Sequence, residues 1–137
     1  MYKLQNDVLK IAVAERGAEL KSITAVADGT EYLFDSDPTW WKYSSPVLFP
    51  IVGKVNDNKY RAEGKEFSLG QHGFARTTDF WIVDATDTSL TFALEANVAT
   101  LKVYPYKFRL EISYELIANE VKVRWKVANV DDKEIYF

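Results

Sequence analysis

The stretch GQHGFARTTDFW, residues 70–81, contains the side chains of this chain that are best suited to chemistry. It includes His72, the only histidine, and Arg76 follows four positions later. Histidine is the side chain best suited to proton exchange near neutral pH, and arginine donates several hydrogen bonds from one planar group. Lys54, in IVGKV, is a third candidate donor. These residue types fit a site that binds a polar ligand and moves a proton.

Each of these three residues also has an ordinary structural interpretation. A histidine between a glutamine and a glycine fits a turn in which the ring nitrogens bond to nearby backbone. Arg76 fits a surface ion pair with Asp79, and Lys54 fits a solvated loop position. Nothing within residues 70–81 supplies a second catalytic partner for the histidine. The short motif alone therefore favours a turn.

Composition restricts the chemistry further. The chain has 137 residues, 47% of them hydrophobic, a net charge of -3 and no cysteine. It is too apolar for a disordered protein and too nearly balanced in charge for nucleic acid to be an expected partner. One histidine and no cysteine exclude a thiolate or histidine-rich zinc site, and we expect no metal and no cofactor. The sequence shows no signal-like segment and no apolar run of membrane-spanning length, so we expect a cytoplasmic protein without a membrane partner.

Alternation of apolar and polar residues with a period of two runs through most of the chain and predicts strands in place of helices. The clearest segments are DVLKIAVA, AELKSITAV, EYLF, KYRAEGKEFSL, FWIVDA and LTFALEA. Turn signals separate them, including Glu63-Gly64 inside KYRAEGKEFSL. We therefore expect an all-β fold, an antiparallel β-sandwich, with residues 1–137 forming a single domain.

Between residues 35 and 58 the alternation fails. This stretch carries three of the four prolines and two of the four tryptophans, Trp40 and Trp41. A long shaped loop of this kind often carries function. The two tryptophans, together with Phe74, have the flat shape that stacks on an apolar face of a ligand. Core packing is nevertheless the commoner role of aromatic side chains in a β protein, and we expect it here.

The segment KFRLEISYELIANEVKVRWKVAN, residues 107–129, predicts a hairpin with a two-residue turn at Ala118-Asn119. This turn sets the register, and it places Glu115 opposite Lys122 and Glu111 opposite Lys126 on the solvent face. The remaining alternate positions are apolar and predict one buried face: Leu110, Ile112, Tyr114, Leu116, Val121, Val123, Trp125 and Val127.

Three stretches in order, SSPVLFPIVGKVNDNKY, GKEFSLGQHGFAR and TLKVYPYKFRLEISYEL, are preceded by GAELKSI and GTEYLF. Together they resemble the amino-terminal half of the aldose 1-epimerase (galactose mutarotase-like) family, in its bacterial mutarotase-like branch. The combination of LFPIVG with QHGFAR is the most specific part of the resemblance. The resemblance implies that the chain is part of a galactose mutarotase-like supersandwich, in a family that interconverts the α and β anomers of an aldose without a cofactor.

The resemblance also implies roles for the three candidate residues. His72 matches the histidine that hydrogen-bonds the sugar near its ring oxygen, so it is the candidate catalytic residue. Arg76 and Lys54 become donors to an aldose, phosphorylated or not, with Lys54 standing where relatives often carry arginine. In the family, a glutamate base and a second histidine lie in the carboxyl-terminal half. Neither is present here, and we expect the chain alone to be inactive.

Two further expectations complete the interpretation. A non-catalytic carbohydrate-binding β-sandwich module would use the same polar and aromatic residues and is the alternative function. A supersandwich sheet draws strands from both halves of such a chain, so we expect open strand edges and self-association through residues 121–129.

Overall fold

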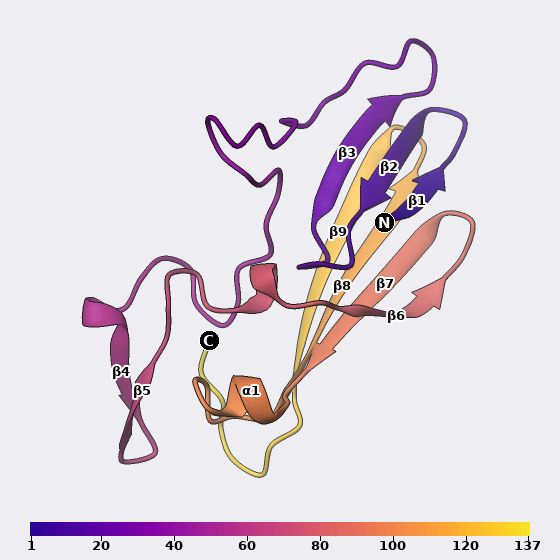
Figure 1. Cartoon of the computed structure of the whole chain (residues 1–137). Coiled ribbons are helices and arrows are strands. Elements are labelled where there is room, and N and C mark those ends of the chain that lie inside the picture. Colours follow the sequence, from indigo (N-terminus) through magenta and orange to yellow (C-terminus); the bar gives the residue numbers. More distant parts are fainter.

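The computed structural model describes all 137 residues, and antiparallel strands dominate it (Figure 1). Three sheets form, with strand orders β1-β2-β3, β4-β5 and β6-β7-β8-β9. The strands are β1 (Tyr2–Gln5), β2 (Leu9–Val13), β3 (Leu20–Ala25), β4 (Lys59–Ala62), β5 (Lys65–Ser68), β6 (Trp81–Ala85), β7 (Ser89–Glu95), β8 (Phe108–Ile117) and β9 (Glu120–Asn129). Three short helical turns are η1 (Asn56–Asn58), η2 (Ala75–Thr77) and α1 (Val98–Leu101). The predicted all-β, antiparallel fold is confirmed.

The three-stranded and four-stranded sheets share one apolar core. In β2, the alternate residues Leu9, Ile11 and Val13 are buried, as their spacing predicts. They belong to the same cluster as the buried face of β8, whose alternate residues from Phe108 to Leu116 are all buried. Burial of these two facing rows removes apolar surface from water and is the main force that holds the sheets together.

One buried hydrogen bond crosses between the sheets. The Tyr114 hydroxyl, on β8, donates to the backbone oxygen of Ala18 at 2.7 Å, immediately before β3. A buried hydroxyl needs such a partner, and this bond fixes where the start of β3 lies on the four-stranded sheet. The same region leads into the loop that carries the candidate site.

The hairpin β8–β9 has the predicted turn and register. Ile117 pairs with Glu120 across Ala118-Asn119, and the two predicted opposite-charge pairs face each other, Glu115 with Lys122 and Glu111 with Lys126. In the second pair the Lys126 ammonium lies 3.2 Å from a Glu111 carboxylate oxygen. Arg109 also bonds to Glu111, and these two cations hold the pKa of the Glu111 carboxyl below its usual range.

The prediction of one continuous buried face on this hairpin is wrong for the middle of β9, whereas Val121 and Val127 do pack against the core. On β8 the apolar residues are buried, whereas Val123 and Trp125 on β9 are 46% and 47% exposed. The physical reason is position: β9 is the last strand of its sheet, it pairs with β8 alone, and β1-β2-β3 covers the sheet mainly at β7 and β8. Strand alternation reveals which side chains share a face, but not whether another layer covers that face.

Three smaller features of the structure also differ from what the sequence predicts. EYLF is not a strand, because Glu31 forms only an isolated bridge to Thr24. The first strand, β1, was not expected, since its four residues are too few to show a pattern. The turn α1 was not expected either, although Asn97 caps it by accepting from the backbone of Ala99 and Thr100. No helix in the structure has the length and apolar character needed to cross a bilayer.

The sequence predicts a long loop over residues 35–58, and the structure has it over residues 26–55, with no strand or helix inside it. The loop runs along one side of the sandwich and leads into the β4–β5 hairpin, which projects away from both sheets (Figure 1). Glu63 and Gly64 close this hairpin with positive φ angles of 49° and 73°, as the turn signal predicts. The QHGFAR motif, residues 71–76, follows this hairpin in the chain.

Candidate functional site

His72 lies in a tight turn, and its ring is held by the neighbouring loop. The backbone N–H of His72 donates to the Gly53 oxygen at 2.7 Å, and the Gly53 N–H donates back to His72 Nδ1 at 2.9 Å. Because Nδ1 accepts a hydrogen bond, the neutral imidazole carries its proton on Nε2. The half-buried ring therefore presents Nε2–H as a donor. The turn that the motif alone favours is present, and it orients the ring.

Gly73 allows the two motifs to come into contact. Its φ is +67°, and a Cβ atom built on it would lie 2.3 Å from the Phe49 oxygen, too close for any side chain. The same Phe49 oxygen accepts from the backbone N–H groups of Phe74 and Ala75, at 2.9 and 3.2 Å. LFPIVG and QHGFAR are thus paired through their backbones, which explains why the two stretches carry glycines at these points.

Phe74 is part of the core, as expected. Its ring lies 6.1 Å from that of Phe49 and 5.9 Å from that of Phe108 on β8, measured between centroids. The ring therefore anchors the QHGFAR segment on the four-stranded sheet while the polar side chains beside it stay near the surface. Phe74 is partly buried against the core, which supports the packing role over stacking on a ligand.

Arg76 does not form the surface ion pair that was one of its two interpretations. Asp79 pairs instead with Arg16, at 3.3 Å. The Arg76 guanidinium lies 5.1 Å from the centre of the Tyr43 ring and donates one hydrogen bond to the Gln71 oxygen at 3.1 Å. A guanidinium has five N–H donors, so most of them remain available beside the His72 turn.

Glu19 holds the loop against which Arg76 packs, and sequence reasoning missed it. Its side chain is only 10% exposed, and Oε1 accepts from the backbone N–H groups of Ser44 and Ser45 at 2.6 and 3.2 Å, with Lys21 Nζ at 3.4 Å. A buried carboxylate is stable only when paired and hydrogen-bonded in this way. Tyr43 immediately precedes the two serines. No spacing rule marks Glu19, because its partners are backbone groups 25 residues away.

Lys54 follows Gly53 directly and is exposed. Its ammonium has no hydrogen bond or ion pair with the rest of the chain. The structure therefore brings His72 and Arg76 together around Gln71 and places the backbone of Lys54 next to the His72 ring. It does not join the Lys54 side chain to either of them.

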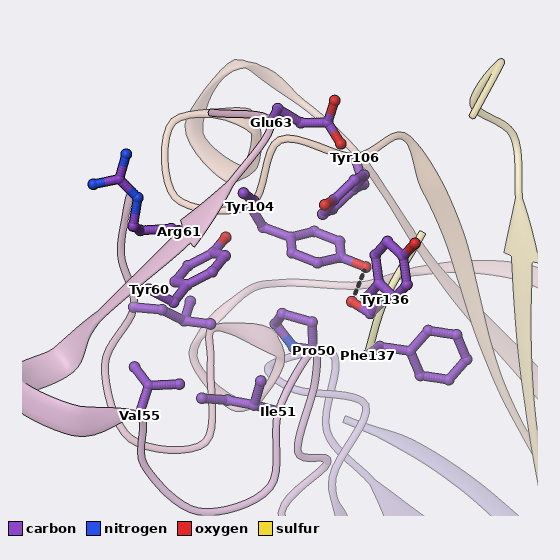
Figure 2. Close-up of a pocket in the computed structure, with 12 residues that line it drawn as sticks. Pro50, Ile51, Val55, Tyr60, Arg61, Glu63, Tyr104, Tyr106, Tyr136 and Phe137 are labelled. Carbon is purple, nitrogen blue, oxygen red and sulfur yellow. Dashed lines mark hydrogen bonds between the residues drawn. The ribbon is translucent and has the colours of Figure 1, made fainter. Parts of the chain in front are cut away.

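On the other side of the same loop lies a cavity of about 550 Å³, the tyrosine pocket (Figure 2). Residues 50, 51 and 55 of the loop line it together with Tyr60, Tyr104, Tyr106 and Tyr136. Two hydroxyls are already bonded, since Tyr60 donates to the Val103 oxygen and Tyr104 to the Tyr136 oxygen. Burial raises the pKa of Tyr60 to about 12. His72, Arg76 and Lys54 do not line this pocket, which is mainly apolar and offers little polar chemistry.

Comparison with known proteins identifies the family of the chain. The family model for aldose 1-epimerase matches residues 1–137, the whole chain. The chain belongs to the aldose 1-epimerase family. The predicted resemblance to the amino-terminal half of that family is thereby confirmed.

This aldose 1-epimerase family member is similar to the chromosomal protein LacX of Lactococcus lactis subsp. lactis, with 31% identity over 96% of the chain and 46% of LacX. Among solved structures, it is similar to a galactose mutarotase related enzyme from Lactobacillus acidophilus, with a TM-score of 0.96, 37% identity, and coverage of 98% of this chain and 45% of that one. A galactose mutarotase-like protein from Lactobacillus casei matches with a TM-score of 0.95, 39% identity, and coverage of 98% and 46%. The chain spans about half the length of the relatives that it matches.

Proposed function

We propose that the protein binds an aldose and takes part in interconverting its α and β anomers, with His72 hydrogen-bonding the sugar near its ring oxygen. The observation that supports this most is the pair of hydrogen bonds between His72 and Gly53, which leaves Nε2–H as the free donor. A donor held rigidly before the substrate arrives stabilises developing charge without reorganisation. The membership of the aldose 1-epimerase family supplies the substrate class.

The proposed reaction needs two proton transfers. A base takes the proton of the C1 hydroxyl while an acid donates one to the ring oxygen, the C1–O5 bond breaks, and the open aldehyde closes again on either face. In this proposal His72 Nε2–H donates a hydrogen bond to the ring oxygen as charge develops there, and the acid that protonates this oxygen is a separate group. One imidazole cannot act on both sides of C1 at once. The family resemblance implies a second histidine as the acid and a glutamate of the carboxyl-terminal half as the base, and His72 is the only histidine among these 137 residues.

Arg76 and Lys54 are the proposed substrate-binding residues. The stacked guanidinium of Arg76 has free N–H donors for a sugar hydroxyl, or for the phosphate of a phosphorylated aldose. Lys54 is exposed, has no partner in the chain and follows Gly53, which is bonded to His72. Its ammonium would add a point-charge donor to a sugar hydroxyl. A self-associated state through the open edge of β9 is also part of the proposal.

A carbohydrate-binding role without catalysis is the second candidate. It is favoured by the exposed tryptophans of the long loop, Trp40 and Trp41. Polarimetry on freshly dissolved α-D-glucose tests whether these 137 residues catalyse the interconversion by themselves. Acid–base assistance accelerates such steps by about 10²- to 10⁴-fold. We expect the 137-residue chain alone to give a rate near that of buffer. A fast rate that His72→Ala removes would overturn this expectation and exclude the purely binding role.

Sugar binding itself is tested by calorimetric titration with D-glucose and D-galactose. We expect His72→Ala and Arg76→Ala each to weaken binding by about 2- to 10-fold, the effect of losing a hydrogen-bond donor. Arg16→Ala is the matched control, because Arg16 is a neighbouring arginine occupied by Asp79. Equal affinities in all three variants would show that the sugar binds elsewhere, and no detectable binding would refute the proposal.

A further inference from the structure

Trp40 and Trp41 do not lie in the core, which contradicts the expectation drawn from the sequence. They are 80% and 48% exposed, on the long loop. The physical reason is that the loop passes outside both sheets, so these two side chains have no second layer to pack against (Figure 1). Tyr43, two positions after Trp41, is different. Its ring is half-buried and contacts Arg76 of the QHGFAR motif.

The contact between Tyr43 and Arg76 differs from those that hold other arginines of the chain. The Arg76 guanidinium lies 5.1 Å from the centre of the ring, within the distance at which an aromatic ring attracts a cation. Arg16 and Arg109 are held by carboxylates, whereas Arg76 takes part in no ion pair. A carboxylate occupies N–H donors and offsets the positive charge, but a ring face occupies none. The ring therefore restrains Arg76 and leaves its N–H donors free, apart from the one bonded to the Gln71 oxygen.

The Tyr43 ring is itself held in place. The Trp41 ring packs edge-to-face against it, with centroids 5.9 Å apart. Ser44 and Ser45 follow directly, and their backbone N–H groups donate to the buried Glu19 carboxylate, while the Ser45 hydroxyl donates to the backbone at the start of β3 at 2.8 Å. The Tyr43 hydroxyl takes part in no hydrogen bond. The face of the ring is therefore the part of this side chain that acts on the guanidinium.

We propose that Tyr43 is a positioning residue of the candidate sugar site, whose ring holds the Arg76 guanidinium beside the His72 turn before the aldose binds. The second restraint is the Gln71 backbone oxygen, which accepts one guanidinium N–H at 3.1 Å and immediately precedes His72. A donor restrained in this way loses less conformational entropy when the ligand binds. The proposal rests on the proposed function, in which Arg76 binds the aldose, and adds the residue that orients it.

The first measurement needs no ligand. It is the ¹⁵N NMR relaxation of the arginine side-chain Nε–H groups in the whole protein, with the Arg76 signal assigned by its loss in Arg76→Lys. We expect the ¹H–¹⁵N NOE of Arg76 to exceed that of Arg124, which is exposed and has no ion pair. Tyr43→Leu should lower the Arg76 value to that of Arg124, whereas Tyr43→Phe keeps the ring and should leave it unchanged. Arg16 is the internal control, because Asp79 holds it in all variants.

The second measurement is calorimetric titration of the same variants with D-glucose. We expect Tyr43→Leu to weaken binding by about 2- to 5-fold, the effect of losing a cation–π contact at a partly exposed site. Tyr43→Phe should bind as the unsubstituted protein does. In a protein that already carries Arg76→Ala, Tyr43→Leu should have no further effect, because the ring acts only through the guanidinium.

The outcomes separate this proposal from the function on which it rests. If Tyr43→Leu leaves the Arg76 NOE unchanged, or lowers it without weakening a glucose affinity that Arg76→Ala does weaken, the positioning role is wrong and the aldose site stands. If Tyr43→Leu weakens binding equally with and without Arg76, the ring contacts the sugar directly and the proposal is overturned. If the unsubstituted protein does not bind glucose, the proposed function fails and this proposal fails with it.

Discussion

Gly53 and His72 exchange two hydrogen bonds in opposite directions, one between backbone groups and one from the Gly53 N–H to the imidazole Nδ1. The backbone bond fixes the distance between the two loops, and the second bond fixes the ring and its tautomer. Positioning and chemistry therefore come from the same contact. Any substitution that separates the two loops is therefore expected to change the position of the His72 Nε2–H donor as well.

Gly73→Ala is expected to destabilise the fold by roughly 3 kcal/mol or more, because the new methyl group would overlap the Phe49 carbonyl. Gly64→Ala is the matched control. It has a similar φ of +73° but open space around it, so it should cost only the left-handed strain of about 1–2 kcal/mol. Urea denaturation measures both. Equal losses in the two variants would show that LFPIVG and QHGFAR are not in close contact.

Glu19→Ala is expected to lower stability by about 1–3 kcal/mol, since the amide groups of Ser44 and Ser45 lose their acceptor. Glu19→Gln keeps an acceptor oxygen and should recover part of the loss. Glu66→Ala, which breaks an exposed ion pair with Lys59, should cost less than about 1 kcal/mol. Thermal unfolding followed by circular dichroism compares the three variants. A Glu19→Ala protein as stable as Glu66→Ala would show that Glu19 does not anchor the loop at Ser44 and Ser45.

Stability should decline at alkaline pH. Burial raises the pKa of Tyr60 to about 12 and also raises the pKa of Tyr114, above the value of about 10 expected in the unfolded chain. The folded state then binds protons more tightly, so its stability is complete below about pH 10 and falls as the pH rises toward 12. Denaturation midpoints across this range measure the fall. Tyr114→Phe should make it shallower, and an unchanged slope would argue against burial of this hydroxyl.

The open edge of β9 is expected to cause self-association, because its backbone is unpaired on one side and Val123 and Trp125 are half exposed. Light scattering from micromolar to millimolar concentration tests this, and the apparent mass should rise. Trp125→Lys should suppress the rise by placing a charge on the exposed face. A monomer throughout the range would mean that the edge is protected within the chain.

The sequence predicted those features that depend on local pattern. The β8–β9 turn and its charge pairs follow from alternation and turn chemistry, and both appear in the structure. The exposure of Trp125 depends instead on which strand ends the sheet, a property of the assembled topology that no local pattern contains. Trp40 and Trp41 were placed in the core for a similar reason, since composition alone does not show on which side of the sandwich a loop passes.

For the candidate site, the sequence identified the residues but not their contacts. His72 and Arg76 stand out by type and by the family motif. Their partners, Gly53 and Tyr43, lie 19 and 33 positions earlier in the chain, and Glu19 acts through backbone groups that every residue has. Such long-range contacts cannot be predicted from one sequence, so only the structure shows which residues hold the site in place.

The most direct test of the central claim is the ¹⁵N spectrum of the His72 imidazole during titration with D-galactose or D-glucose. Since the chain has one histidine, the imidazole ¹⁵N resonances belong to His72, and their couplings to the ring protons distinguish Nδ1 from Nε2. The account predicts that the neutral ring carries its proton on Nε2, that the Nε2 resonance shifts as aldose binds, and that Nδ1 changes little because Gly53 holds it. A proton on Nδ1, or an Nε2 resonance that does not move at saturating aldose, would contradict the assignment of His72 as the sugar donor.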